Sequence, residues 1–169
     1  MINIITGDPR SKVNCREVFI TDYIKNNYIG TYLDATRFLS EPVDAKDIER
    51  KFYAPIIRSL DDPIVTDLII EYPEMGLSQR SQVKLAQSLI TKIFNTPNYN
   101  LTLLTQSDII FNEIRYVVKE NIISHDEISI KYFSPIKVFD IKLDKNAKIT
   151  NLQEGFLGWV YTDQMCKLF

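Results

Sequence analysis

A short apolar run that ends in acidic residues is the feature that most constrains the fold of this chain. Leu68, Ile69 and Ile70 follow one another without a polar residue, as in a strand whose two faces are both covered in a parallel sheet. Glu71 and Glu74 come directly after the run, and a segment with helical periodicity begins a few residues later. A buried strand that leads through a polar turn into a helix is typical of α/β proteins.

The same alternation of strands and helices continues along the chain. Apolar spacing, capping residues and turn residues predict the individual elements. Strands are expected at residues 2–6, 28–33, 65–70, 101–105, 128–133 and 138–143, and helices at residues 14–27, 44–60 with an interruption near Pro55, 78–95 and 107–120. The predicted fold class is α/β, with a mainly parallel sheet that has helices on both faces. At 169 residues we expect a single domain, residues 1–169.

Composition adds few constraints. The chain is 45% hydrophobic and 25% charged, as in globular proteins, and its net charge of −2 does not support a nucleic-acid partner. Cys15 and Cys166 lie far apart and lack the spacing of a metal site, so we expect idle or buried thiols. No stretch reaches the roughly 18 apolar residues that a membrane span needs, and no signal peptide is evident. We therefore expect a cytoplasmic protein with no membrane partner.

Ligands of parallel sheets bind at the carboxyl ends of the strands. In this chain those ends are Gly7 after the first predicted strand, Glu71 after the third and Gln106 after the fourth. Parallel strands place their carboxyl ends at the same edge of the sheet, so we expect these three segments to converge on one site.

The turn after Gly7 is the candidate phosphate loop. A loop of the G-x-x-x-x-G-K-[ST] type presents backbone N–H groups, a lysine and a hydroxyl to a nucleotide and its magnesium. Here Arg10 and Lys12 follow Gly7, but the second glycine is missing and Val13 replaces the hydroxyl residue. Two interpretations stay open: Gly7, Arg10 and Lys12 contact a nucleotide, or the segment is a strand-to-helix turn capped by Asn14.

Residues 68–82 resemble the Walker B and D-loop segment of the overcoming-lysogenization-defect-like proteins and related AAA-type predicted ATPases of the ABC superclass. Residues 101–108 are similar to the strand and switch segment that follow in this family, and residues 149–156 resemble the tail of one of its branches. The resemblance covers about residues 52–158, in the family's order and spacing. It implies a P-loop NTPase-like, three-layer sandwich, with Glu71 at the magnesium position and Gln106 at the switch position.

The departures from the family's pattern concern the residues that do the chemistry. Tyr72 stands where the family has the carboxylate that polarises water, and Gln106 replaces the switch histidine. Residues 44–51 show no signature segment, and we expect the ABC-type N-terminal lobe to be reduced or missing, since only some fifty residues of this sequence precede the matching region. These losses, together with the incomplete phosphate loop, argue against efficient ATP turnover.

Two functions follow from this pattern. The first is a catalytically degenerate ATPase-fold protein that needs no cofactor and works by binding a protein partner, such as a related ATPase or a second copy of itself. The resemblance makes a phage or mobile-element association natural. The second is a minimal ATP hydrolase that uses Gly7, Arg10 and Lys12 on the phosphates, Glu71 on magnesium, and Glu74 or Gln106 on water, with ATP and magnesium as its cofactors.

Simpler structural interpretations stand beside these functional ones. Glu71 can merely end a strand, and Glu74 can be an acid at a helix start, where the helix dipole favours it. Asn112 and Arg115 are expected to bond to neighbouring loops, and His125 to lie in a surface loop. For the C-terminal aromatic residues, packing is favoured over a partner surface; these residues are Phe156, Trp159, Tyr161 and Phe169.

Overall fold

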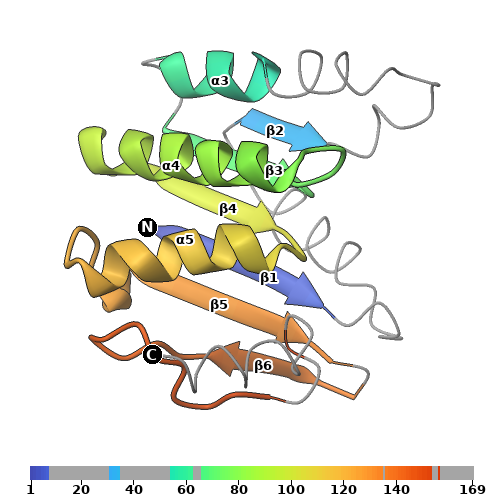
Figure 1. Cartoon of the computed structure of the whole chain (residues 1–169), viewed down its shortest axis with the longest axis vertical. Helices are drawn as coiled ribbons and strands as arrows, with labels where there is room; N and C mark the ends of the chain where they lie inside the picture. The colour runs from blue at the N-terminus through green and yellow to red at the C-terminus, as the bar shows by residue number, and fades with distance from the viewer. Residues whose placement is uncertain (8–30, 35–53, 63–65, 135, 154–155, 157–169) are drawn as a thin grey trace.

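The computed structural model describes residues 1–7, 31–34, 54–62, 66–134, 136–153 and 156 (Figure 1). Within these residues, six strands form one sheet in the order β2-β3-β4-β1-β5-β6. All neighbouring strands are parallel except the last pair, β5 and β6. The strands are β1 Ile2–Gly7, β2 Thr31–Asp34, β3 Asp67–Glu71, β4 Asn100–Leu104, β5 Ile128–Phe133 and β6 Val138–Ile141. The predicted α/β class with a mainly parallel sheet is confirmed.

Three α-helices of the described region lie on the same face of the sheet, where α4 packs between α3 and α5 (Figure 1). They are α3 Ala54–Asp61, α4 Gln79–Asn95 and α5 Asp108–Lys119, and a short 3₁₀ helix, η4 His125–Glu127, precedes β5. The helix predicted at residues 14–27 and the first part of the one predicted at residues 44–60 lie outside the described residues. Pro55 falls in the first described turn of α3.

Serine caps explain why α4 and α5 begin where they do. The Ser78 hydroxyl accepts a hydrogen bond from the Ser81 N–H at 3.2 Å, and the Ser107 hydroxyl accepts one from the Ile110 N–H at 3.1 Å. Each bond satisfies one of the free N–H groups in the first helical turn. The predicted helices at residues 78–95 and 107–120 are therefore confirmed to within about one residue at each end.

The central strands are buried along almost their whole length, as the apolar runs predict. In β3 and β4 every residue after the first is buried, so both faces of these strands are covered. Alternate strand residues such as Leu68, Ile70, Leu101 and Leu103 form one core cluster with residues of α3, α4 and α5. Ile69 does not belong to this cluster and lies on the opposite face, because successive side chains of a strand alternate.

The strand order creates a topological switch point at the middle of the sheet. After β1 the chain returns at β2, at one edge of the sheet, whereas after β4 it returns at β5, on the other side of β1. The order differs from the 3-2-1-4-5-6 and 2-1-3-4-5 orders of the two common doubly wound folds. In open α/β sheets, ligands bind outside the carboxyl ends of the two strands where the connections diverge. Here those strands are β1 and β4.

The described part of the C-terminal region packs on the core. Phe156 is fully buried, and its ring meets Phe111 of α5 edge to face, with ring centroids 5.3 Å apart, and Tyr132 of β5 in the same way at 5.5 Å. The expectation that the aromatic residues near the C-terminus pack is thus confirmed for Phe156. Trp159, Tyr161 and Phe169 lie outside the described residues.

Arg115 connects α5 with the segment after β6. Its Nε donates to the Ala147 carbonyl at 2.8 Å, and its Nη1 donates to Asn112 Oδ1 at 3.1 Å. The prediction of a bond to a neighbouring loop is confirmed for Arg115, whereas the bond of Asn112 is to Arg115 within α5. In the described part of the chain, no helix is long and apolar enough to cross a membrane.

Candidate functional site

The carboxyl ends of β1, β3 and β4 lie side by side, as predicted. Glu71 stands opposite Leu104 in the register of β3 and β4, and Ile5 of β1 stands opposite the same residue on the other side. Two backbone bonds continue the ladder past the strand ends: Tyr72 N–H donates to the Leu104 carbonyl at 2.6 Å, and Thr105 N–H donates to the Ile5 carbonyl at 2.9 Å. The three segments therefore form one edge.

Glu71, the predicted magnesium ligand, is fully buried at the end of β3, with 0% of its surface exposed. Its carboxylate accepts a hydrogen bond from the hydroxyl of Tyr32 on β2. Tyr32 stands opposite Ile69 in the register, so the Tyr32, Ile69 and Glu71 side chains lie on the same face of the sheet. That face is the one opposite α4 and α5.

Glu74, a predicted catalytic residue, joins the turn after β3 to the end of β4. Its Oε2 accepts a hydrogen bond from the Thr105 hydroxyl at 2.7 Å, and its Oε1 accepts one from the Gln106 N–H at 2.6 Å. Burial raises the pKa of the Glu74 carboxyl, although these hydrogen bonds act in the opposite direction. The interpretation of Glu74 as an acid at a helix start is wrong, because α4 begins at Gln79 and has no acid in its first turn.

A chain of side-chain bonds extends this connection to both helices. Ser107 N–H donates to the Thr105 hydroxyl at 3.0 Å, and the Ser107 hydroxyl donates to Gln82 Oε1 at 2.7 Å. The Gln82 amide in turn donates to the Leu77 carbonyl at 3.2 Å. These bonds connect the turn after β3 and the start of α4 with the turn after β4.

Tyr72 adopts a left-handed backbone conformation, with φ of 51°. For a residue with a Cβ atom this conformation costs about 1–2 kcal/mol. Two backbone bonds hold it in place: its N–H bonds to Leu104, and its carbonyl accepts from the Met75 N–H at 3.0 Å. Strained residues of this kind cluster at functional sites. Here the strain is at Tyr72, the position where the ATPases that residues 68–82 resemble carry the carboxylate that polarises water.

A cavity of about 560 Å³ opens beside these residues. The described residues that line it are Tyr72, Glu74, Met75, Gln79, Gln82, Gln106, Ser107, Asp108 and Ile109. Both charged groups of this lining, Glu74 and Asp108, are acidic, and the described lining contains no lysine or arginine. Two carboxylates repel a phosphate group, so this lining does not favour a nucleotide's phosphates.

The structure brings some of the predicted site residues together and leaves others apart. Glu74 and Gln106 meet, but the contact uses the backbone of Gln106, whose side chain is exposed and lines the cavity. Gly7 ends β1, opposite Phe133 of β5. Glu71 does not line the cavity. Arg10 and Lys12 lie outside the described residues.

Sequence reasoning missed three residues that organise the site. Thr105 and Ser107 flank the switch position, and their hydroxyls were detectable as capping candidates after a strand. Tyr32 gives no such signal, because its partner Glu71 is 39 positions away.

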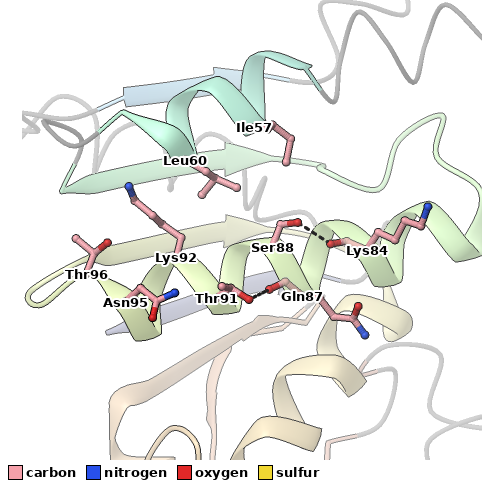
Figure 2. A pocket seen from close by; sticks show the side chains of 9 residues that line it. All are labelled: Ile57, Leu60, Lys84, Gln87, Ser88, Thr91, Lys92, Asn95 and Thr96. Atoms are coloured by element: carbon pink, nitrogen blue, oxygen red, sulfur yellow. Dashed lines mark hydrogen bonds between the residues drawn. The ribbon is translucent and has the colours of Figure 1, made fainter.

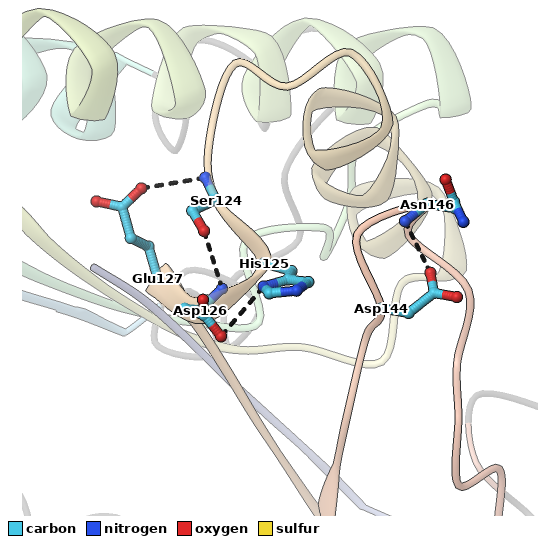
Figure 3. A network of polar contacts seen from close by, with 6 residues as sticks. All are labelled: Ser124, His125, Asp126, Glu127, Asp144 and Asn146. Carbon is cyan, nitrogen blue, oxygen red and sulfur yellow. Dashed lines mark hydrogen bonds and ion pairs between the residues drawn. The ribbon is translucent and has the colours of Figure 1, made fainter.

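His125 lies in η4, which precedes β5, and its side chain is partly exposed; Figure 3 shows its contact with the neighbouring Asp126. Its Nδ1 is 3.1 Å from an oxygen of the neighbouring Asp126, and Ser124 caps the same short helix by bonding the Asp126 N–H at 3.3 Å. These contacts are local, which agrees with the expected surface position.

Among the described residues, no three or more histidine, cysteine and acidic side chains gather in a way that could hold a metal ion.

The buried Glu74 carboxyl predicts a specific pH dependence of stability. A carboxyl whose folded-state pKa is raised contributes stability below its unfolded pKa, near 4.5, and loses that contribution as the pH rises through the folded pKa. We therefore expect wild-type protein to gain stability relative to Glu74→Gln as the pH falls from 7 to about 4.5. Urea unfolding of both proteins across this range measures the difference.

A Glu120→Gln variant controls for the general loss of one carboxylate, because Glu120 is exposed at the end of α5. A wild-type protein that instead loses stability relative to Glu74→Gln on acidification would show that the hydrogen bonds outweigh burial and lower the pKa.

Comparison with known proteins yields no relative: neither a protein-family model nor a curated protein matches the chain.

Proposed function

We propose that this protein is a catalytically degenerate member of the ATPase family that residues 68–82 resemble, and that it works by binding a protein partner. In this proposal the sheet and its carboxyl edge are kept as a scaffold, while the ATP-hydrolysing parts have been lost. The partner is a related ATPase or a second copy of this chain.

The observation that supports this proposal most is the use of both acidic side chains of the Walker B-like segment, residues 68–74, inside the protein. Glu71 is fully buried and bonded to Tyr32, and both oxygens of Glu74 are bonded at the end of β4. A carboxylate that holds magnesium or activates water needs a lone pair directed at the ion or the water. In this protein, protein donors already bind both oxygens of Glu74 and one oxygen of Glu71, which leaves fewer lone pairs for an ion or a water.

The electrostatics of the edge support the same proposal. A nucleotide brings several negative charges, and ATPases meet them with lysine, magnesium and backbone N–H groups. The described lining of the cavity offers amide groups, a phenol and two carboxylates. Amides and a phenol suit recognition of a neutral polar surface, such as a protein backbone, better than recognition of phosphates.

The minimal ATP hydrolase remains the second candidate, and one observation favours it. The carboxyl ends of β1 and β4 form the switch point at which open α/β sheets bind their ligands. Gly7 is at that point, and Arg10 and Lys12 follow it in the sequence.

Calorimetric titration with ATP and magnesium separates the two candidates. We expect no binding tighter than about 100 μM, a level within the range of Michaelis constants of working enzymes. The Gly7→Val variant is the matched control, because a side chain at this position blocks a close approach of phosphate to the backbone. Tighter binding that is lost in Gly7→Val would refute the proposal and establish the nucleotide site.

A further inference from the structure

A groove of about 690 Å³ runs between α3 and α4, separate from the carboxyl edge of the sheet (Figure 2). Ile57 and Leu60 point from α3 into this groove, and Lys84 and Lys92 line it from α4. None of the residues already assigned to the candidate site contributes to it. The groove is therefore a second concave surface with its own chemistry.

The middle of the groove presents apolar surface. Leu60 is buried, and Ile57 is partly buried and packed on the core. Two hydroxyl groups on α4 are already used within the helix: Ser88 donates to the Lys84 carbonyl at 3.0 Å, and Thr91 donates to the Gln87 carbonyl at 2.8 Å. These hydroxyls are thus committed as donors, so apolar contact with a ligand comes from Ile57 and from the small exposed part of Leu60.

Both charged side chains among the described residues that line the groove are positive. Lys84 and Lys92 line it, and none of its described lining residues is acidic. Among the described residues neither lysine makes an ion pair. The Lys92 ammonium lies 3.4 Å from the Asp62 carbonyl and 5.7 Å from the centre of the Tyr99 ring, contacts that orient it without neutralising its charge. In a chain of net charge −2, this strip selects for an acidic ligand.

The spacing of the two lysines fits a helix. Lys92 lies eight positions after Lys84 on α4, which corresponds to about 12 Å along the axis. A helix laid along the groove brings residues i and i+7 to the same side, about 10 Å apart, and residues i+3 and i+4 between them. Acidic residues at i and i+7 then reach the two lysines, while apolar residues at i+3 and i+4 meet Ile57 and Leu60.

We propose that the groove between α3 and α4 docks an acidic, amphipathic helix of a partner protein. This inference deepens the proposed function, because it assigns the partner a surface and a chemistry. It depends on charge complementarity at Lys84 and Lys92 and on apolar contact with Ile57 and Leu60.

The test uses a synthetic helical peptide of 18 residues, with glutamates seven positions apart and leucines three and four positions after the first glutamate. We expect it to bind the full chain in fluorescence anisotropy, and we expect the Lys84→Glu/Lys92→Glu variant to bind it at least about tenfold more weakly. The Lys142→Glu/Lys145→Glu variant is the matched control, since it reverses two exposed lysines away from the groove. It should bind like the wild type. Thermal melts of both variants check that the fold is unchanged.

Three results would overturn the inference. They are no binding of the peptide at 1 mM, equal weakening in both double variants, and equal binding of a peptide with lysines in place of the glutamates. A 20-base-pair DNA that binds more tightly than the peptide and depends on Lys84 and Lys92 would also overturn it, in favour of a nucleic-acid surface. Failure here leaves the proposed function intact, because that proposal is tested by nucleotide titration and does not depend on where the partner binds.

Discussion

The Phe156→Ala variant is expected to lose about 3–5 kcal/mol of unfolding free energy, the range for a large aromatic side chain removed from a core. Phe156 is 0% exposed, and its ring contacts Phe111 and Tyr132 edge to face. Each such aromatic pair adds about 0.5–1.5 kcal/mol beyond the burial of apolar area. Because a domain of this size is stable by only about 5–15 kcal/mol, the loss would remove a large share of the total.

Urea unfolding followed by circular dichroism measures this loss, and the midpoint should fall while the slope stays constant. Phe94→Ala is the matched control, because Phe94 is 66% exposed at the end of α4 and its removal should change stability by less than about 0.5 kcal/mol. Equal effects of the two substitutions would mean that Phe156 does not belong to the core.

The regular elements were predictable where local signals agreed. For α4 and α5, helices were predicted at residues 78–95 and 107–120, and the structure confirms both to within about one residue at each end. The buried run of β3 was recognisable because both of its faces are covered, which removes the polar alternation of an exposed strand. The meeting of the three strand ends followed from parallel topology alone.

The predicted end of β6 shows where local signals fail. The strand was expected to reach residue 143 but ends at Ile141. Beyond it, Leu143 pairs with Ile149 in an isolated antiparallel bridge. The Asn151 side chain accepts a hydrogen bond from the Lys142 N–H at 2.8 Å and donates one to the Asp140 carbonyl at 2.6 Å. The residues that bond to this segment, Ile149 and Asn151, come later in the chain, so the apolar pattern of residues 138–143 alone does not predict where β6 ends.

The residues of the candidate site could be predicted from the sequence, but the hydrogen bonds that join them could not. Glu71, Glu74 and Gln106 were selected by their position at strand ends, and all three lie at the expected edge. Their hydrogen bonds join residues that are 31 to 39 positions apart. The sequence therefore indicates which acidic groups gather at the edge, but it does not show that protein donors bind them.

Replacing Glu71 with alanine is expected to destabilise the protein by about 1.5–3 kcal/mol, the range for losing a hydrogen bond to a charged group. The reason is structural: the bond between Tyr32 and the buried Glu71 joins β2 to β3, and alanine removes the acceptor and leaves a void. Glu71→Gln should lose less than about 1 kcal/mol, because the amide oxygen still accepts from the Tyr32 hydroxyl. Tyr32→Phe should resemble the alanine variant, because it leaves a buried carboxylate without this donor.

The sign of this effect distinguishes the two proposed functions. Working active sites keep charged groups in arrangements that weaken the fold, so removal of a catalytic or metal-binding carboxylate commonly raises stability at the cost of activity. A carboxylate that has become part of the scaffold behaves in the opposite way, and its loss lowers stability.

Urea unfolding of Glu71→Ala, Glu71→Gln and Tyr32→Phe, together with the Glu71→Ala/Tyr32→Phe double variant, measures both the sign and the coupling energy of the pair. A Glu71→Ala variant that is more stable than the wild type would contradict the scaffold interpretation and favour the ATP hydrolase, because a buried acid that costs stability is retained for a ligand.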